Sequence, residues 1–295
     1  MCHKEKNVGM PLLNMRTAVA LLVLLVGGCA GHQPAPSGAK AAPDSAVLMA
    51  ADSTREAGRY AEALQIYQRL LITSPGLLGA RYGAAECSLA LGQPDNALTL
   101  FDGLVANGEF HARALQGKGL AQFALGRRDD AGQSLREATA SDPTLWRAWN
   151  GLGDLADQER KPKEAAALYA KALALQPNSA MVVNNVGYSL LGSGNYVDAI
   201  SEFRKALALE PNNLTVQTNL RLALAASGDY EAALRSAPSE QLPNLLNDVG
   251  YIALRRGDYA AAEHYLTKAM DASGTYSTVA ARNLDWLKDK QGAAQ

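Results

Sequence analysis

Apolar and polar positions follow one pattern that repeats over most of this chain. Alanine marks the register at intervals of 34 residues, at Ala63, Ala97, Ala131, Ala165, Ala199 and Ala233. Within each interval, two stretches of about a dozen residues carry apolar side chains three and four positions apart, which is the spacing of an amphipathic helix. The pattern therefore predicts an all-α chain of helical hairpins, each of which buries its apolar face only against its neighbours.

The ends of the helices are marked in phase with the alanines. Glycine precedes the alanine by five residues at Gly58, Gly92, Gly126, Gly194 and Gly228, and proline follows it by twelve at Pro75, Pro143, Pro177 and Pro211. Arg160 is the exception in the glycine series. Glycine is expected in the turn between the two helices. Proline ends the second helix, because it lacks an amide hydrogen and restricts the residue before it.

Small and bulky residues also alternate in register. Small residues are needed where two helices approach closely, and they occur in the first helix at Gly119, Gly153, Gly187 and Gly250. Bulky side chains follow the marker alanine by four residues, at Tyr67, Phe101, Leu135, Tyr169 and Phe203. We expect these bulky side chains to fill the space between neighbouring hairpins.

The period fails once, near the end of the chain. From Gly228 the next glycine in phase is Gly257, only 29 residues later, and the intervening SAPSEQLPN contains Pro238 and Pro243. The second helix of the sixth hairpin is therefore predicted to stop early. The shortening is either a tolerated surface deletion or a bend that redirects the stack or opens an intermediate groove.

A last helix is predicted beyond the hairpins, over 277–290. Val279, Leu284 and Leu287 are spaced to lie on one side of it. Such a helix would cap the open end of the stack, and we expect Trp286 to close the last hairpin.

The N-terminal segment has the order of a secretory signal. Arg16 precedes nine apolar residues, Ala18 to Val26, whereas a membrane-spanning helix needs about 20. Met1, Met10 and Met15 are all possible starts. The sequence Val26-Gly27-Gly28-Cys29 then resembles the bacterial lipobox, which implies cleavage after residue 28 and acylation of Cys29. Because Ala30 and not Asp follows the cysteine, the resemblance implies the outer membrane.

These features divide the chain into four parts. Residues 1–28 are predicted as a lipoprotein signal peptide, and residues 29–43, rich in Pro, Ala and Gly, as the acylated Cys29 and a flexible tether. Residues 44–274 contain the repeats, with the sixth shortened. Residues 275–295 are the capping helix and tail.

Composition excludes several classes of function. Of three cysteines, Cys2 lies in the predicted signal and Cys29 would carry lipid, so Cys87 remains as a single thiol without a disulfide partner. The net charge is −1, and no basic cluster indicates nucleic acid as a partner. The four histidines are isolated, and neither metal-ligand spacing nor a catalytic motif is present. We therefore expect no metal, no cofactor and no enzymatic activity, and we expect Cys87 to be a buried structural thiol.

The repeat resembles the tetratricopeptide (TPR) family. Its clearest copies are Trp149-x-x-Leu152-Gly153 and Gly194-x-Tyr196-x-x-Ala199-x-x-x-Phe203-x-x-Ala206. The resemblance implies an α-solenoid: a right-handed superhelix of about seven hairpins with a concave groove and a C-terminal capping helix. It also implies that positions two, five, six, nine and twelve of each first helix face that groove.

The predicted groove carries carboxamides at one level and apolar groups one turn further along. Its residues are Gln116, Leu120, Phe123, Arg147, Asn150, Asp154, Asn184, Asn185, Tyr188, Leu191, Thr218, Asn219, Leu222, Asn247, Tyr251 and Leu254. Asparagine both donates to and accepts from a peptide group, which favours a peptide or an amphipathic helix as the partner. Alternatively, an apolar member packs within the superhelix. Arg113 and Arg147 are the only basic candidates, so a clamp for a terminal carboxylate is not expected.

A narrower resemblance concerns the repeats around residues 183–225. Val183-Asn184-Asn185-Val186-Gly187-Tyr188-Ser189-Leu190 and the following GNYVDAISEFRKALALEPNN resemble the TadD family of TPR lipoproteins from Flp (Tad) pilus systems. The resemblance implies a pilotin-like assembly factor that holds a secretin or another pilus component at the periplasmic face of the outer membrane. The alternatives are a pilotin for type IV pili and a periplasmic scaffold or regulator of cell-wall synthesis.

Overall fold

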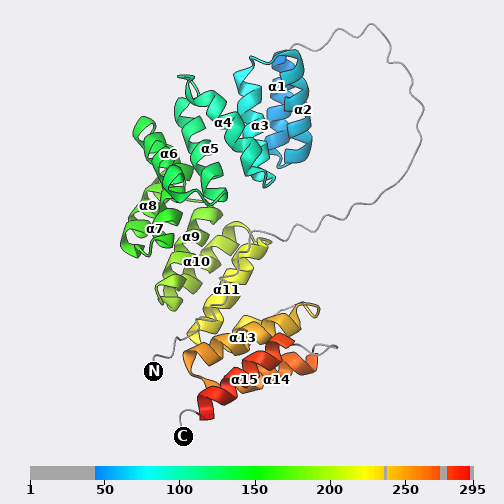
Figure 1. Cartoon of the computed structure of the whole chain (residues 1–295), viewed down its shortest axis with the longest axis vertical. Helices are drawn as coiled ribbons and strands as arrows, with labels where there is room; N and C mark the ends of the chain where they lie inside the picture. Colours follow the sequence, from blue (N-terminus) through cyan, green and yellow to red (C-terminus); the bar gives the residue numbers. More distant parts are fainter. Residues whose placement is uncertain (1–43, 236–237, 273–277, 293–295) are drawn as a thin grey trace, which may run out of the picture. The chain divides into compact units, whose positions relative to one another are not determined.

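The computed structural model describes residues 44–235, 238–272 and 278–292. Within these ranges every regular element is a helix and no strand occurs, which confirms the predicted all-α hairpin solenoid (Figure 1). The predicted signal peptide, Cys29 and the tether lie outside the described residues. No helix among the described segments is long and apolar enough to cross a membrane.

Fifteen helices are found in the described residues. Their bounds are α1 Asp44–Glu56, α2 Tyr60–Thr73, α3 Leu78–Ala90, α4 Pro94–Val105, α5 His111–Ala124, α6 Arg128–Ser141, α7 Trp146–Gln158, α8 Pro162–Leu175, α9 Ala180–Gly192, α10 Tyr196–Leu209, α11 Leu214–Ser227, α12 Tyr230–Leu234, α13 Leu242–Arg256, α14 Tyr259–Ala272 and α15 Thr278–Gly292. They form seven consecutive pairs and a final single helix, as predicted.

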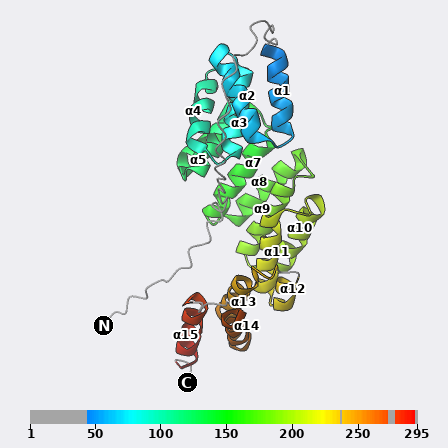
Figure 2. The same ribbon diagram turned by 90° about the vertical axis from the view of Figure 1, so that its right-hand side faces the viewer.

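The odd-numbered helices form one continuous layer. Each of them contacts the next odd-numbered helix, from α1 to α15, and each also packs on the even-numbered helices beside it. In the described part of the chain no contact joins two even-numbered helices. The helices follow one another in chain order (Figure 2). The odd-numbered helices therefore present one shared face along the stack, and the even-numbered helices lie behind it.

The turns between paired helices use the left-handed backbone region. Glycine has a positive φ at Gly58, Gly92, Gly126, Gly194, Gly228 and Gly257, between 70° and 98°. Arg160 takes the same turn position with a φ of 59°, and it is the only other described residue with a positive φ. An L-residue with a side chain is strained in this region by about 1–2 kcal/mol. The exception in the sequence pattern is therefore a strained turn.

Replacing this arginine should stabilise the protein. Arg160→Gly is expected to raise the free energy of unfolding by about 0.5–1 kcal/mol, because the relief of strain exceeds the added flexibility of glycine in the unfolded chain. Urea unfolding followed by circular dichroism measures the change. The reciprocal Gly194→Arg, at a turn with open space around it, should lower stability by a similar amount. An Arg160→Gly protein less stable than wild type would contradict the expected strain.

Each second helix ends before its proline, and the residue directly before the proline already has a non-helical backbone. Ser74, Asp142, Gln176 and Glu210 precede them, with φ between −132° and −141° and ψ between 73° and 99°. Proline excludes the helical region for the residue before it. The predicted role of the proline series is confirmed.

The glycines of the first helices allow close packing. A Cβ atom built on Gly153 would lie 2.5 Å from Cε1 of Tyr169, and one built on Gly187 would lie 2.7 Å from Cε1 of Phe203. Gly117 would meet Phe101 of the preceding hairpin at 2.3 Å. The bulky side chains thus fill space both within a hairpin and between neighbours, and they are completely or almost completely buried.

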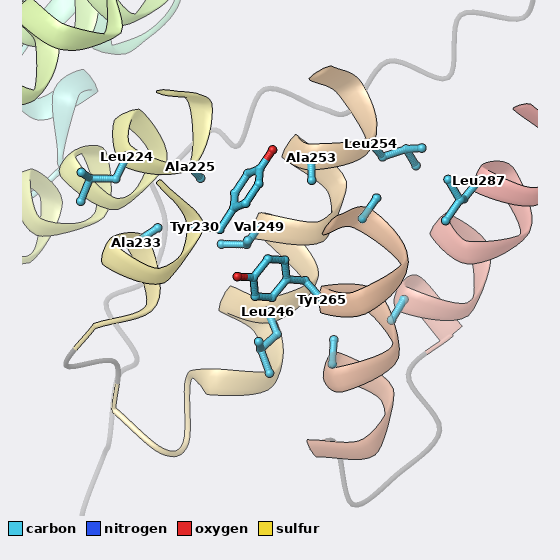
Figure 3. Close-up of a cluster of buried hydrophobic side chains, with 13 residues drawn as sticks. Leu224, Ala225, Tyr230, Ala233, Leu246, Val249, Ala253, Leu254, Tyr265 and Leu287 are labelled. Carbon is cyan, nitrogen blue, oxygen red and sulfur yellow. The ribbon is translucent and has the colours of Figure 1, made fainter. Parts of the chain in front are cut away.

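The sixth hairpin is shortened as predicted. Its second helix, α12, has 5 residues, whereas α10 has 14. One apolar cluster nevertheless joins α11 to α15 (Figure 3). In this cluster the rings of Tyr230 and Tyr265 meet edge to face, with centroids 5.6 Å apart.

The capping helix differs from the prediction at one position. Val279 is 52% exposed, whereas Ala280 and Leu287 are buried in the C-terminal cluster. The apolar side of α15 therefore starts one residue later than expected, because Ala280 and not Val279 faces the last hairpin. Trp286 stacks on Tyr251 of α13, with ring centroids 6.2 Å apart.

Candidate functional site

The predicted groove residues lie on α5, α7, α9, α11 and α13, in the layer of odd-numbered helices. Their exposure differs widely. Gln116, Asn150, Asn219 and Leu254 are buried, Tyr188 is 50% exposed, and the other eleven are half-buried. Only part of the predicted set can therefore contact a partner without rearrangement.

The carboxamides join neighbouring hairpins to one another. Asn185 Nδ2 donates to Asn150 Oδ1 at 3.1 Å, and Asn219 Nδ2 donates to Asn184 Oδ1 at 2.9 Å. At the C-terminal end, Asn283 Nδ2 donates to Asn247 Oδ1 at 3.0 Å. We call these three side-chain pairs the carboxamide ladder. It fixes the register of consecutive hairpins, because a buried amide must find its hydrogen-bond partner inside the fold.

The buried carboxamides correct the sequence interpretation. Gln116 is 5% exposed, and its Oε1 accepts from the backbone N–H of Ala148 at 3.1 Å. Asn150 and Asn219 are 4% and 7% exposed. These three side chains hold the solenoid together, and none of them lies where a peptide partner could reach it in this conformation.

The apolar members also divide into packing and surface residues. Leu254 is 4% exposed within the C-terminal cluster, so its assignment to the groove is wrong. Leu120, Phe123 and Leu191 pack against buried clusters, as the alternative interpretation expected. Tyr251 is covered in part by Trp286. Leu222 and Thr218 line a small recess between α11 and α13. Tyr188 remains the exposed aromatic side chain of the set.

Two carboxylates meet at one phenol between α7 and α8. Tyr169 Oη lies 2.8 Å from Asp154 Oδ1 and 2.9 Å from Asp157 Oδ2. Asn185 Nδ2 donates to Asp154 at 3.0 Å, and Ser189 Oγ donates to Asp157 at 2.6 Å. Burial of the phenol, reinforced by the two negative charges, raises the pKa of Tyr169 far above its ordinary value. The phenol therefore stays protonated and can donate its hydrogen to one carboxylate at a time.

The corresponding tyrosine of the first hairpin, Tyr67, has differently charged neighbours. There Tyr67 Oη donates to Asp52 Oδ1 at 2.6 Å, and Arg55 Nε donates to Tyr67 Oη at 3.3 Å. Asp157 stands three repeats after Arg55 in the same register. The phenol of the fourth hairpin thus has two carboxylates beside it, where that of the first hairpin has a carboxylate and a guanidinium.

A second charged contact spans two hairpins. Arg147 of α7 pairs with Glu86 of α3, with 2.6 Å between Nη1 and Oε2. Arg113 lies over the rings of Tyr82 and Phe110, 5.2 and 4.8 Å from their centroids. Burial raises the pKa of Tyr82 to about 12. Both basic groove candidates are therefore engaged within the chain, Arg147 in an ion pair and Arg113 against two aromatic rings.

Tyr82, Glu86 and Asp157 are not among the predicted groove residues, because the predicted positions start at the third hairpin and leave out position twelve of the fourth. The 34-residue register could have found them. Glu86 stands two repeats before Asp154, and Tyr82 stands two repeats before Asn150.

The described residues contain no group of three or more His, Cys, Asp or Glu side chains that could hold a metal ion. Cys87 is buried, and burial raises the pKa of its thiol to about 11. A thiol in this state is a poor nucleophile at neutral pH. Among the predicted groove residues, Tyr188 is exposed, and Asp154 beside it is half-buried, as is Asp157.

The comparisons with known proteins agree with this architecture. Family models described as "Tetratricopeptide repeat" match residues 55–119 and 190–236 in one case and 117–180 in the other, which together span more than half of the chain. No curated protein matches at a significant level.

Solved structures of bacterial repeat proteins share the fold. A thermophilic TPR protein from Thermus thermophilus is 23% identical with a TM-score of 0.55, over 62% of this chain and 99% of the other. A tetratricopeptide repeat protein from Parabacteroides merdae is 15% identical with a TM-score of 0.52, over 83% and 98%. The C-terminal part of a TPR protein from Cytophaga hutchinsonii is 18% identical with a TM-score of 0.50, over 80% and 99%. The chain therefore belongs to the tetratricopeptide repeat proteins.

Proposed function

We propose that this TPR protein is a lipid-anchored scaffold at the periplasmic face of the outer membrane, where it acts as a pilotin-like assembly factor for a Flp (Tad) pilus or secretin machine. The lipobox-like segment that ends in Cys29 supports the anchor. The TadD-like sequence around Asn184 and Tyr188 supports the choice of machine. The TPR fold supports a protein as the partner.

The observation that carries the proposal is the surface shared by α7 and α9. Tyr188 is half exposed. Its chain neighbour Ser189 donates a hydrogen bond to Asp157, and Asn185, one turn earlier on α9, donates one to Asp154. An aromatic side chain therefore lies next to two carboxylates. A partner segment that places a lysine or arginine beside an apolar side chain would satisfy both, since an opposite charge replaces the guanidinium that Arg55 supplies in the first hairpin.

A single substitution tests the groove. Asp157→Arg gives the fourth hairpin the arrangement that Asp52, Arg55 and Tyr67 already adopt, so the fold should be kept. It should abolish partner assembly, because a basic partner side chain would then meet a like charge. The assay is the formation of secretin multimers in cells that lack the wild-type gene and carry the variant. Asp130→Arg, at an exposed position of α6 outside this layer, is the matched control and should restore multimers as wild type does.

Deletion of the gene tests the assembly role itself. Secretin multimers should disappear in the deletion strain and return with the wild-type chain. Normal multimers without the chain would contradict the pilotin role. Normal multimers with Asp157→Arg would contradict the proposed basic partner segment while leaving the scaffold role intact.

A further inference from the structure

The shortened sixth hairpin leaves a defined space. The helices α8 and α12 start at corresponding positions, but α8 has 14 residues and α12 has 5. The missing part corresponds to the last two and a half turns of α8, residues 167–175. In a complete hairpin this part packs on the first helix of the next hairpin.

A cavity of about 500 Å³ lies where the missing turns would pack. It is lined by Leu242 and Leu246 from the first half of α13, by Tyr265 of α14 and by Leu234, the last residue of α12. Leu246 and Tyr265 lie side by side (Figure 3). Glu231 of α12 also lines the cavity, and its carboxylate accepts a hydrogen bond from Tyr265 Oη at 2.8 Å. The cavity is therefore mainly apolar, with one carboxylate already paired inside it.

A complete hairpin shows what fills the corresponding space. Val183 of α9 occupies the register position of Leu246 and belongs to a buried cluster, and Leu173 from the second half of α8 packs against that cluster. The position that corresponds to Leu173 is not part of α12, because α12 ends at Leu234. An occupant that lies as α8 does would therefore place an apolar side chain at this unfilled position, beside the cluster that contains Leu246.

We infer that this cavity is a second protein-binding site, which takes a short amphipathic helix of another protein in place of the missing turns of the sixth hairpin. Charge on the rim supports a partner of this kind. Lys268 and Asp271 are exposed and three residues apart on α14. A helix with apolar residues at spacings of three and four, flanked by an acidic and a basic side chain one turn apart, matches both the apolar lining and the rim.

The inference is tested with a peptide probe on the full mature chain. The probe is a fluorescent peptide with the sequence of residues 167–175, ALYAKALAL, held helical by a staple on its outward face, since so short a helix is marginal by itself. Saturable binding is expected by fluorescence anisotropy. Ala272→Trp, which places an indole at the rim of the cavity, should weaken binding at least tenfold. Ala260→Trp, at an exposed position on the same helix outside the cavity, should leave binding unchanged.

Three outcomes would overturn the inference. The first is that the peptide does not bind saturably. The second is equal binding by wild type and Ala272→Trp. The third is a concentration-dependent dimer in sedimentation that Ala272→Trp dissociates, because the occupant would then be a second copy of the chain. The result does not depend on Asp157 or on the outcome of the secretin assay.

Discussion

Phe203→Ala is expected to lower the free energy of unfolding by about 3–5 kcal/mol. The side chain is completely buried among Val183, Ala199 and Val216, so its removal leaves a cavity at the junction of two hairpins. A solenoid is stabilised mainly by contacts between neighbours, and loss of one junction weakens the repeats on both sides. Denaturant unfolding followed by circular dichroism measures the loss. Val197→Ala on the same helix is the control, because Val197 is 76% exposed and its change should stay within about 0.5 kcal/mol.

A double-mutant cycle measures the energetic coupling between Phe203 and Gly187. Gly187→Ala places a Cβ 2.7 Å from the ring of Phe203 and should cost about 1–3 kcal/mol through overpacking. Phe203→Leu removes ring atoms that this Cβ would meet. The double variant should therefore be more stable than the sum of the two single changes predicts. Strict additivity would show that the glycine is not required by the aromatic ring.

The hairpin pattern could be predicted from sequence because each marker has a local physical cause. Gly92 ends a helix through its positive φ, and Pro177 excludes the helical region for Gln176. Both effects act within a few residues and recur in most of the repeats. The shortening of α12 followed from the same markers, since Pro238 and Pro243 fall where the helix would have continued.

The burial of the carboxamides could not be predicted in this way. Asn219 and Asn184 are 35 residues apart, and whether one amide faces the other or the solvent depends on the rotation between hairpins. A groove position in the family pattern tells which face of the helix a residue occupies, but it does not tell how exposed the side chain is. Asn150 and Asn219 were predicted to contact a partner, but both side chains are buried and form hydrogen bonds with the neighbouring repeat instead.

The sequence shows that the fourth and first hairpins differ in charge at one register position, but only the structure shows which group this charge contacts. Asp157 and Arg55 occupy one register position. Only the shared contact with Tyr169 or Tyr67 shows that the exchange changes the charge around a buried phenol. The surface at α7 and α9 is thus defined by a departure from the repeat.

Cys29→Ser is expected to move the protein from the membrane fraction to the soluble fraction almost completely. A single acyl chain binds a bilayer only marginally, whereas two or more hold it stably, so a multiply acylated cysteine would account for all of the membrane affinity. The described helices offer no segment that could replace it by crossing a bilayer. Serine keeps the size of the side chain but removes the thiol that the lipid requires. Fractionation with metabolic labelling by a fatty acid measures both effects together.

The control for this experiment is Cys87, the cysteine of the repeat-containing part. Cys87 is completely buried in α3, so Cys87→Ala should leave both labelling and membrane retention unchanged. Retention of the Cys29→Ser protein after a high-salt wash would contradict the anchor. Release by salt alone would instead indicate attachment through charge, since surface ion pairs weaken as screening increases. The expected result is that the Cys29→Ser protein carries no label and leaves the membrane fraction without added salt. Lipid on Cys29 would then be what holds the chain, with its Asp157 surface, at the membrane.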